Sequence, residues 1–264
     1  MGNLAQMGEA SVYLGKYRGT PCIHKTNASE LEVYFYRVVA PELRQGGVNI
    51  PILFESQNRA LCLEYIPHSI PLFELNQSQE ACRQLAVIHN ADLPQTTLTK
   101  AHIWTEAQTS QALSRLSLPN ESNKIVKTMC RLGQILFRSL PRSRQNFISG
   151  DSNSGNWGRR DNGDLVLFDW ERFGQGSPAI DLAPLVQGLG THATFSDIAT
   201  RYLRSNRFID DNTLLQHLIL AKVWIAIEVV NLLVERENPN TDKYIDYFDE
   251  HLPRWLEKYI YYLQ

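Results

Sequence analysis

The strongest constraint on the fold is a change in hydrophobic pattern at Pro67. Upstream of it, apolar residues form short runs rich in β-branched and aromatic side chains, which is typical of strands. Downstream of it, they recur at helical intervals over long segments. We therefore expect an α+β fold with two lobes: a small β-rich lobe over residues 1–67 and a larger, mostly helical lobe over residues 68–264. The cleft between two such lobes is a natural ligand site.

Local signals place the elements within each lobe. Short runs at 10–14 and 21–25, separated by Gly15 and Gly19, predict a hairpin. A helix is expected over residues 29–39, capped by Asn27 or Ser29. Two more strands are expected at 50–55 and 59–66, and helices at 77–90, 121–140, 195–204, 212–235 and 242–263. Between the second and third of these helices, residues 147–181 hold two short apolar runs, 147–149 and 165–168.

Composition excludes several classes of protein. The 264 residues are 43% hydrophobic and 20% charged, with a formal net charge of -2, which describes an ordinary globular protein and argues against a generic nucleic-acid binder. The most apolar stretch, 214–234, carries His217, Lys222, Glu228 and Asn231, so we expect a buried helix rather than a membrane span.

Cysteine usage and the first residues predict where the protein acts. Its four cysteines are widely separated and form no CxxC pair, which favours buried free thiols in a reducing compartment. The first ten residues lack the charged start and apolar run of a signal peptide. We expect a cytoplasmic protein, with no obligate protein partner evident.

Two polar blocks carry the chemistry. Gly150-Asp151-Ser152-Asn153-Ser154-Gly155-Asn156 is followed by Phe168-Asp169-Trp170-Glu171. A phosphoryl-transfer site needs a group that takes the proton of the acceptor and groups that neutralise charge on the transferred phosphate. Asp151 is a candidate base, and Asn156 and Asp169 offer the oxygen ligands that Mg²⁺ prefers.

These blocks resemble those of the aminoglycoside phosphotransferase and choline kinase family, the small-molecule relatives of protein kinases. The catalytic loop of that family reads His-Gly-Asp, four residues, Asn, and this chain has Ser149-Gly150-Asp151, four residues, Asn156. The resemblance continues through Asp181-Leu182-Ala183 and the Leu-Ala-x-x-His pattern at 85–89. It implies a bilobal protein-kinase-like fold and an ATP-dependent kinase that uses Mg²⁺ to phosphorylate a hydroxyl of a small molecule. Asp181 is expected to brace the catalytic loop.

The same resemblance implies nucleotide-binding residues in the first lobe. Residues 8–13, with Gly8 and Ser11, are similar to the loop that covers the phosphates, and Lys25 matches the lysine that reaches the α- and β-phosphates. Glu32 matches the glutamate that orients this lysine, with Glu30 as a rival. Residues 63–66, which include Glu64 and Ile66, are similar to the inter-lobe hinge.

One departure and three alternatives accompany the resemblance. Ser149 replaces the usual histidine of the loop, which puts the rigidity of the loop in doubt and leaves a non-catalytic nucleotide-binding module as the alternative. Gly150-Asp151-Ser152 also occurs in serine esterases, but no aspartate here has histidine three residues later to complete that site. A protein kinase is disfavoured because no Ala-Pro-Glu segment follows Asp169.

The acceptor itself is not readable from the sequence. Glu228 and the acid-rich run 235–250, interleaved with aromatic residues, suggest a cationic acceptor such as an aminoglycoside or choline. An amphipathic terminal helix with aromatics inward and acids outward explains the same spacing.

Overall fold

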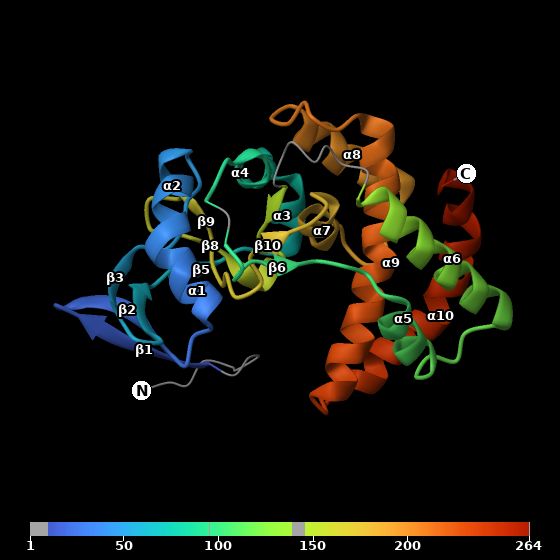
Figure 1. The fold of residues 1–264 in the computed structure, drawn as a ribbon, viewed down its shortest axis with the longest axis horizontal. Coiled ribbons are helices and arrows are strands. Elements are labelled where there is room, and N and C mark those ends of the chain that lie inside the picture. The colour runs from blue at the N-terminus through green and yellow to red at the C-terminus, as the bar shows by residue number, and fades with distance from the viewer. Residues whose placement is uncertain (1–9, 95, 139–145, 264) are drawn as a thin grey trace.

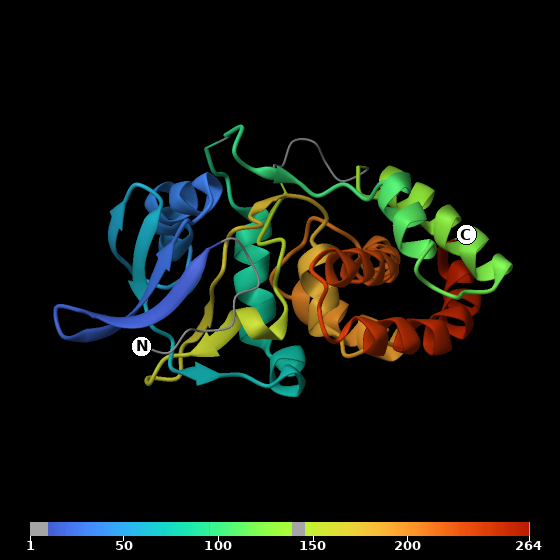
Figure 2. The same cartoon turned by 90° about the horizontal axis from the view of Figure 1, so that it is seen from below.

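The computed structural model describes residues 10–94, 96–138 and 146–263, so Gly8 lies outside the described part of the chain. The elements form a small β-rich lobe at one end of the long axis and a larger helical part at the other (Figure 1). This is the expected α+β, protein-kinase-like architecture. Seen from below, residues 147–175 lie between the first sheet and the long helix α9 (Asp211–Glu235) (Figure 2).

The first lobe is built on a four-stranded antiparallel sheet with the order β1-β2-β4-β3. Strands β1 (Ser11–Tyr17) and β2 (Thr20–Thr26) form the predicted hairpin, but they extend through Gly15. The turn lies at Arg18 and Gly19, whose φ angles are 49° and 90°, as a tight two-residue hairpin turn requires. Strands β3 (Leu53–Gln57) and β4 (Ala60–Glu64) complete the sheet.

One helical segment packs beside this sheet and continues further than expected. It starts with α1 (Glu30–Tyr34), capped by the side chain of Ser29 rather than Asn27, and passes through the π-helical turn η1 (Phe35–Val39) into α2 (Ala40–Gln45). The prediction ended this helix at Val39, whereas the helical segment continues through Pro41. Proline lacks the N–H that an interior helical position donates, but its place in the first turn of α2 needs no such bond.

Two small sheets hold the segments that carry the predicted site residues Asp151, Asn156 and Asp169. Strands β8 (Trp157–Arg159) and β9 (Leu165–Leu167) form a hairpin that pairs with β5 (His68–Ser69). The other sheet has the order β6-β10-β7, made of Lys100–Ala101, Gly174–Gln175 and Phe147–Ile148. The sequence predicted the apolar runs at β7 and β9 but not β5, β6, β8 and β10, which are two or three residues long and contain no apolar run.

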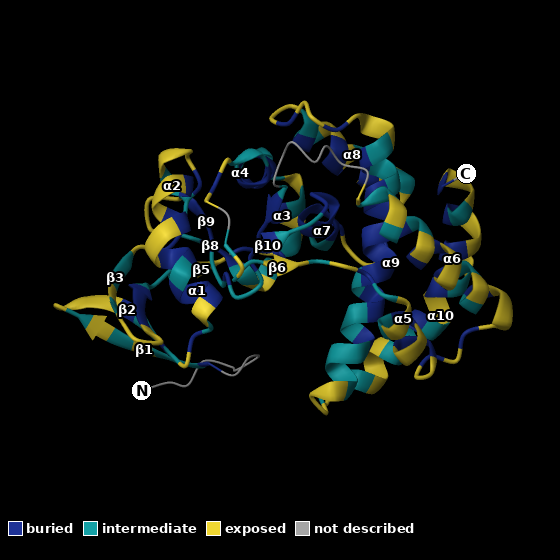
Figure 3. Ribbon diagram, in the orientation of Figure 1, coloured by how far each residue is buried: buried dark blue, intermediate teal, exposed yellow. Residues whose placement is uncertain are grey.

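The remaining helices form the second lobe. Helix α9 contacts α5, α6, α7, α8 and α10, and its central residues are buried (Figure 3). Among the described residues, α9 is long and apolar enough to cross a membrane, but 61% of its most apolar 18-residue stretch is buried inside the fold. It is thus the expected buried helix. The other elements are α3 (Leu72–Gln77), α4 (Gln79–Asn90), α5 (Glu106–Leu113), α6 (Asn120–Leu136), η2 (Ser154–Asn156), α7 (Ala179–Leu182), η3 (Ala183–Leu185), α8 (His192–Leu203), α10 (Thr241–Tyr259) and η4 (Ile260–Leu263).

Helix α10 shows where the acid-rich run lies. Phe248 and Trp255 are buried, whereas Asp242 and Asp246 are exposed, and the Asp249 carboxylate caps the backbone N–H of Ser117. Aromatic residues inward and acids outward is the pattern of an amphipathic helix. The structure therefore favours that explanation of the run over a carboxylate-lined pocket.

Candidate active site

The predicted catalytic loop starts from β7 and turns sharply at Gly150. The φ angle of Gly150 is 76°, and a Cβ there would lie 2.4 Å from the carbonyl oxygen of Arg172 and 2.6 Å from the ring of His102. Glycine is thus required by both conformation and space. The turn places Asp151, half-buried, directly after the strand.

Asp181 holds this loop from beneath. Its fully buried carboxylate accepts bonds from the backbone N–H of Ser149 at 2.7 Å and of Gly150 at 2.9 Å, and from the Ser149 hydroxyl at 2.9 Å. His89 approaches the same carboxylate at 3.1 Å. Burial would raise the pKa of Asp181, but the bonds from His89 and Ser149 outweigh burial and lower this pKa. Ser149 therefore anchors the loop, although it replaces the usual histidine.

Asn156 and Asp169 come together at one end of the β8–β9 hairpin. The backbone N–H of Phe168 bonds to the carbonyl of Asn156, which sets the next residue, Asp169, beside it. The Asn156 amide nitrogen donates to the carbonyl of Asp151 at 2.8 Å, so its Oδ1 is the atom that can bind a cation. Asp169 has a φ of 64°, a left-handed conformation that is uncommon outside glycine and often marks functional positions.

Lys25 links the two lobes through Asp169. Its Nζ lies 2.9 Å from Asp169 Oδ1 and 2.7 Å from Glu32 Oε2. Burial would lower the pKa of Lys25, but the two carboxylates outweigh burial and raise it, so the lysine stays charged. Glu30 is exposed, so the phase of α1 selects Glu32 as the partner of Lys25.

An ion pair joins Arg172, whose charge acts on Asp151, to Glu228 of α9. Arg172 Nη2 lies 3.2 Å from both carboxylate oxygens of Glu228. Burial raises the pKa of Asp151, against the opposing effects of the Asn153 hydrogen bond and the Arg172 charge. The sequence singled out Glu228 only as part of an acidic region, and Arg172 not at all, because no local pattern shows that the two residues meet.

The remaining predicted nucleotide residues lie in β1 and at the hinge. Ser11 is the first residue of β1 and pairs with Thr26, beside Lys25. The Glu64 side chain forms a two-point ion pair with Arg160, at 2.7 and 2.9 Å, that joins β4 to the β8–β9 turn. Ile66 packs over Gly158. A role of Ser11, Glu64 and Ile66 in nucleotide binding stays a prediction, as does that of Gly8.

Ser152 cannot serve as the nucleophile of an esterase in this arrangement. Its side chain is fully buried, and its hydroxyl donates to the backbone carbonyl of Asp181. A nucleophile needs a base within hydrogen-bond reach and an open path to substrate. The geometry therefore removes the hydrolase alternative.

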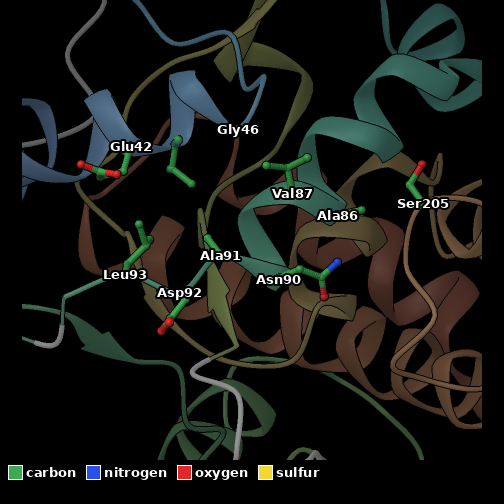
Figure 4. A pocket seen from close by; sticks show the side chains of 10 residues that line it. Glu42, Gly46, Ala86, Val87, Asn90, Ala91, Asp92, Leu93 and Ser205 are labelled. Atoms are coloured by element: carbon green, nitrogen blue, oxygen red, sulfur yellow. The ribbon is translucent and has the colours of Figure 1, made fainter.

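A separate pocket of about 370 Å³ lies between α2 and α4 (Figure 4). It is lined by Glu42, Val87, Asn90 and Asp92, among others, and by none of the predicted site residues. We therefore identify the candidate active site by the titratable groups that converge around Asp151 and Asp169 and by the ion pair between Lys25 and Asp169, not by this pocket.

Comparison with known proteins agrees with the geometry. The profile of the phosphotransferase enzyme family matches residues 26–213. No curated protein matches the chain in sequence.

Solved structures share the fold at low sequence identity. Choline kinase LicA from Streptococcus pneumoniae has a TM-score of 0.64 and 17% identity, over 98% of this chain and 93% of that chain. Spectinomycin phosphotransferase, solved with ADP and spectinomycin, has a TM-score of 0.67 and 14% identity, over 100% and 91%. A macrolide 2'-phosphotransferase from Brachybacterium faecium has a TM-score of 0.59 and 10% identity, over 93% and 90%.

Proposed function

The chain belongs to the phosphotransferase enzyme family, and we propose that it transfers the γ-phosphate of ATP to a hydroxyl group of a small molecule. One observation carries the proposal: Lys25, paired with Glu32 in the first lobe, reaches Asp169 at the end of the β8–β9 hairpin, beside Asn156 and Asp151. Three of the similar structures contain AMP or ADP, which supports the choice of nucleotide. We further propose residues 1–67 as the nucleotide lobe and residues 68–264 as the catalytic lobe.

Each residue has a distinct proposed role. Asp151 takes the proton of the acceptor hydroxyl, and burial favours this role because it raises the pKa of the carboxylate. Lys25, kept charged by its two carboxylate partners, binds the phosphates. Asn156 and Asp169 provide an amide oxygen and a carboxylate, a donor set that fits Mg²⁺. When bound there, Mg²⁺ would neutralise phosphate charge.

The acceptor is proposed to be an amine-bearing alcohol. Choline and spectinomycin, the molecules named with two similar structures, both carry nitrogen cations at neutral pH. In this chain, Glu228 brings a carboxylate to Arg172 beside Asp151, and an ammonium group could share that carboxylate. The four cysteines are free thiols, which supports a cytoplasmic location.

The test of the proposal is a magnesium-ATP consumption screen against aminoglycosides, choline, ethanolamine and neutral sugars. With the accepted substrate, Asp151→Asn should lower kcat by about 10²–10⁴-fold and leave ATP affinity nearly unchanged, because the carboxylate acts on the acceptor. Asp161→Asn is the matched control, since this carboxylate is 89% exposed on the β8–β9 turn and should not affect kcat. ATP binding without turnover of any acceptor would instead indicate a non-catalytic nucleotide-binding module.

The acceptor class has its own test. Glu228→Gln should raise the KM of a cationic acceptor more than it changes kcat, and salt should raise that KM in the wild type. Preference for neutral sugars, or a KM insensitive to both changes, would refute an amine-bearing acceptor while leaving the kinase assignment intact.

A further inference from the structure

Three soft ligands gather on the first sheet, away from the candidate active site. Cys22 and His24 lie on β2, and Cys62 lies on β4 directly opposite His24. Side chains alternate between the faces of a strand, so Cys22 and His24 share the face opposite to that of Lys25. The sulfur atoms and a ring nitrogen of these three residues all lie within 4.8 Å of one another, and Cys22 Sγ is 3.3 Å from His24 Nε2.

The neighbouring strand β1 fixes the imidazole ring of His24 toward the two cysteines. Tyr13 pairs with His24 across the strands, and its ring stacks on the imidazole with centroids 5.0 Å apart and planes 16° apart. Gly15, opposite Cys22, leaves room for the ring: a Cβ at Gly15 would lie 2.5 Å from His24 Cδ2 and 2.8 Å from Nε2. The orientation of the ring thus depends on Tyr13 and Gly15 of the neighbouring strand.

We propose that Cys22, His24 and Cys62 form a binding site for a thiophilic d¹⁰ cation, Zn²⁺ or Cu⁺. Two thiolates and one imidazole are the donors that these ions select over the oxygen ligands of Mg²⁺. Ligand atoms in a tetrahedral zinc site lie about 3.4–3.8 Å apart, given bonds of about 2.0–2.3 Å. The distance of 3.3 Å between Cys22 Sγ and His24 Nε2 is close to that spacing, and no pair of ligand atoms is more than 4.8 Å apart.

The surroundings suit a site with one open position. Cys22 and Cys62 are buried, whereas His24 is half-buried, so an ion held by all three reaches solvent on one side. Three protein ligands leave the fourth tetrahedral position to water. The ion would join β2 to β4, the strand that carries Lys25 and the strand that leads into the hinge. Because it binds on the face away from Lys25, it should not compete with ATP.

The first experiment uses the wild-type protein, reduced and freed of metal. Titration with Co²⁺, a spectroscopic substitute for Zn²⁺, should give a thiolate-to-cobalt charge-transfer band that saturates at one ion per chain. Zn²⁺ should then displace Co²⁺. Competition with a Cu⁺ chelator under anaerobic reducing conditions measures the affinity of the protein for Cu⁺. One equivalent of either Zn²⁺ or Cu⁺ bound with thiolate coordination supports the proposal, and absence of both would overturn it.

Variants assign the site. Cys22→Ser, Cys62→Ser and His24→Gln should each weaken binding by at least about tenfold. Cys82→Ser and Cys130→Ser are matched controls, since both thiols are buried in the helical lobe and should leave binding unchanged. Circular dichroism melts show which variants fold. If a serine variant does not fold, His24→Gln still tests the site, because His24 is only half-buried. A Co²⁺ affinity and a charge-transfer intensity that are unchanged in folded Cys62→Ser, or binding that is equal in His24→Gln and wild type, would refute this ligand set.

A final comparison separates this site from the magnesium site. Thermal stabilisation by Zn²⁺ should persist in Asp169→Ala, because Asp169 lies on the catalytic hairpin and not on this face of the sheet. Loss of the zinc effect in Asp169→Ala would place the ion at the catalytic carboxylate instead and overturn the proposal.

Discussion

Replacing Asp181 by asparagine tests how the catalytic loop is held. The two backbone donors meet different oxygens: the N–H of Ser149 bonds to Oδ2 and the N–H of Gly150 bonds to Oδ1. Asparagine has one acceptor oxygen and one NH₂ group, so either orientation of its amide sets NH₂ against a backbone N–H. Loss of a bond to a charged acceptor costs about 1.5–3 kcal/mol, and a buried donor without a partner costs about 1–3 kcal/mol.

We therefore expect Asp181→Asn to lower the free energy of unfolding by about 3–5 kcal/mol. Ser149→Ala is the comparison. It removes the hydroxyl bond to Asp181 at 2.9 Å and the longer bond, at 3.4 Å, that the hydroxyl accepts from the Asp151 N–H, but it keeps both backbone bonds to Asp181. Its cost should be about 1.5 kcal/mol. Urea unfolding at pH 7, followed by circular dichroism, measures both values. The activity of Asp181→Asn should also fall, because the loop that carries Asp151 loses its support.

The pH dependence gives the same variant a second readout. The folded-state pKa of Asp181 is below its usual value, so its carboxylate stabilises the fold above the unfolded-state pKa of about 3.9. That contribution is lost as pH falls through the folded-state pKa, and the difference between wild type and Asp181→Asn should narrow below about pH 4. A loss under about 1 kcal/mol at pH 7, or an equal loss in Ser149→Ala, would refute the reasoning.

Two further predictions concern Lys222 and Gly150. Burial lowers the pKa of Lys222 to about 7, so unfolding takes up a proton between about pH 7 and the unfolded-state pKa of about 10.4. The free energy of unfolding should therefore rise with pH in this range, by at most about 1.4 kcal/mol per pH unit. Lys222→Met should abolish this rise in urea titrations. An unchanged pH slope in Lys222→Met would contradict this assignment. Gly150→Ala should abolish turnover and cost more stability than Gly163→Ala. Gly163 has a φ of 90° but no atom within 4 Å of an added Cβ, so Gly163→Ala should cost only about 1–2 kcal/mol of backbone strain. Equal costs in thermal melts would show that the contacts of an added Cβ at Gly150 with Arg172 and His102 do not matter.

Local physical chemistry made the elements and the chemical blocks readable from the sequence. Alternating and helical periods predicted the hairpin at β1–β2, the helices α4, α6, α8, α9 and α10, and the two-lobed architecture. Boundaries were less predictable. The helix predicted to end at Val39 continues from the π-helical turn at Phe35–Val39 into α2, which holds Pro41 in its first turn. A single sequence shows where a backbone donor is missing, but not whether the local turn needs that donor.

The site itself was determined by contacts between segments far apart in the chain. Lys25 and Asp169 are separated by 144 residues, and Arg172 and Glu228 by 56, so no period or motif predicts either pair. Glu32 rather than Glu30 pairs with Lys25 because of the rotational phase of α1 against the sheet. Glu64 pairs with Arg160 because the β8–β9 hairpin docks beneath the first lobe. The sequence determined which groups can take a proton, bind a cation or form a turn, because these are properties of side chains and of neighbouring residues. Only the tertiary structure decided which of these groups meet, because each pairing depends on burial and on the packing of one lobe against the other.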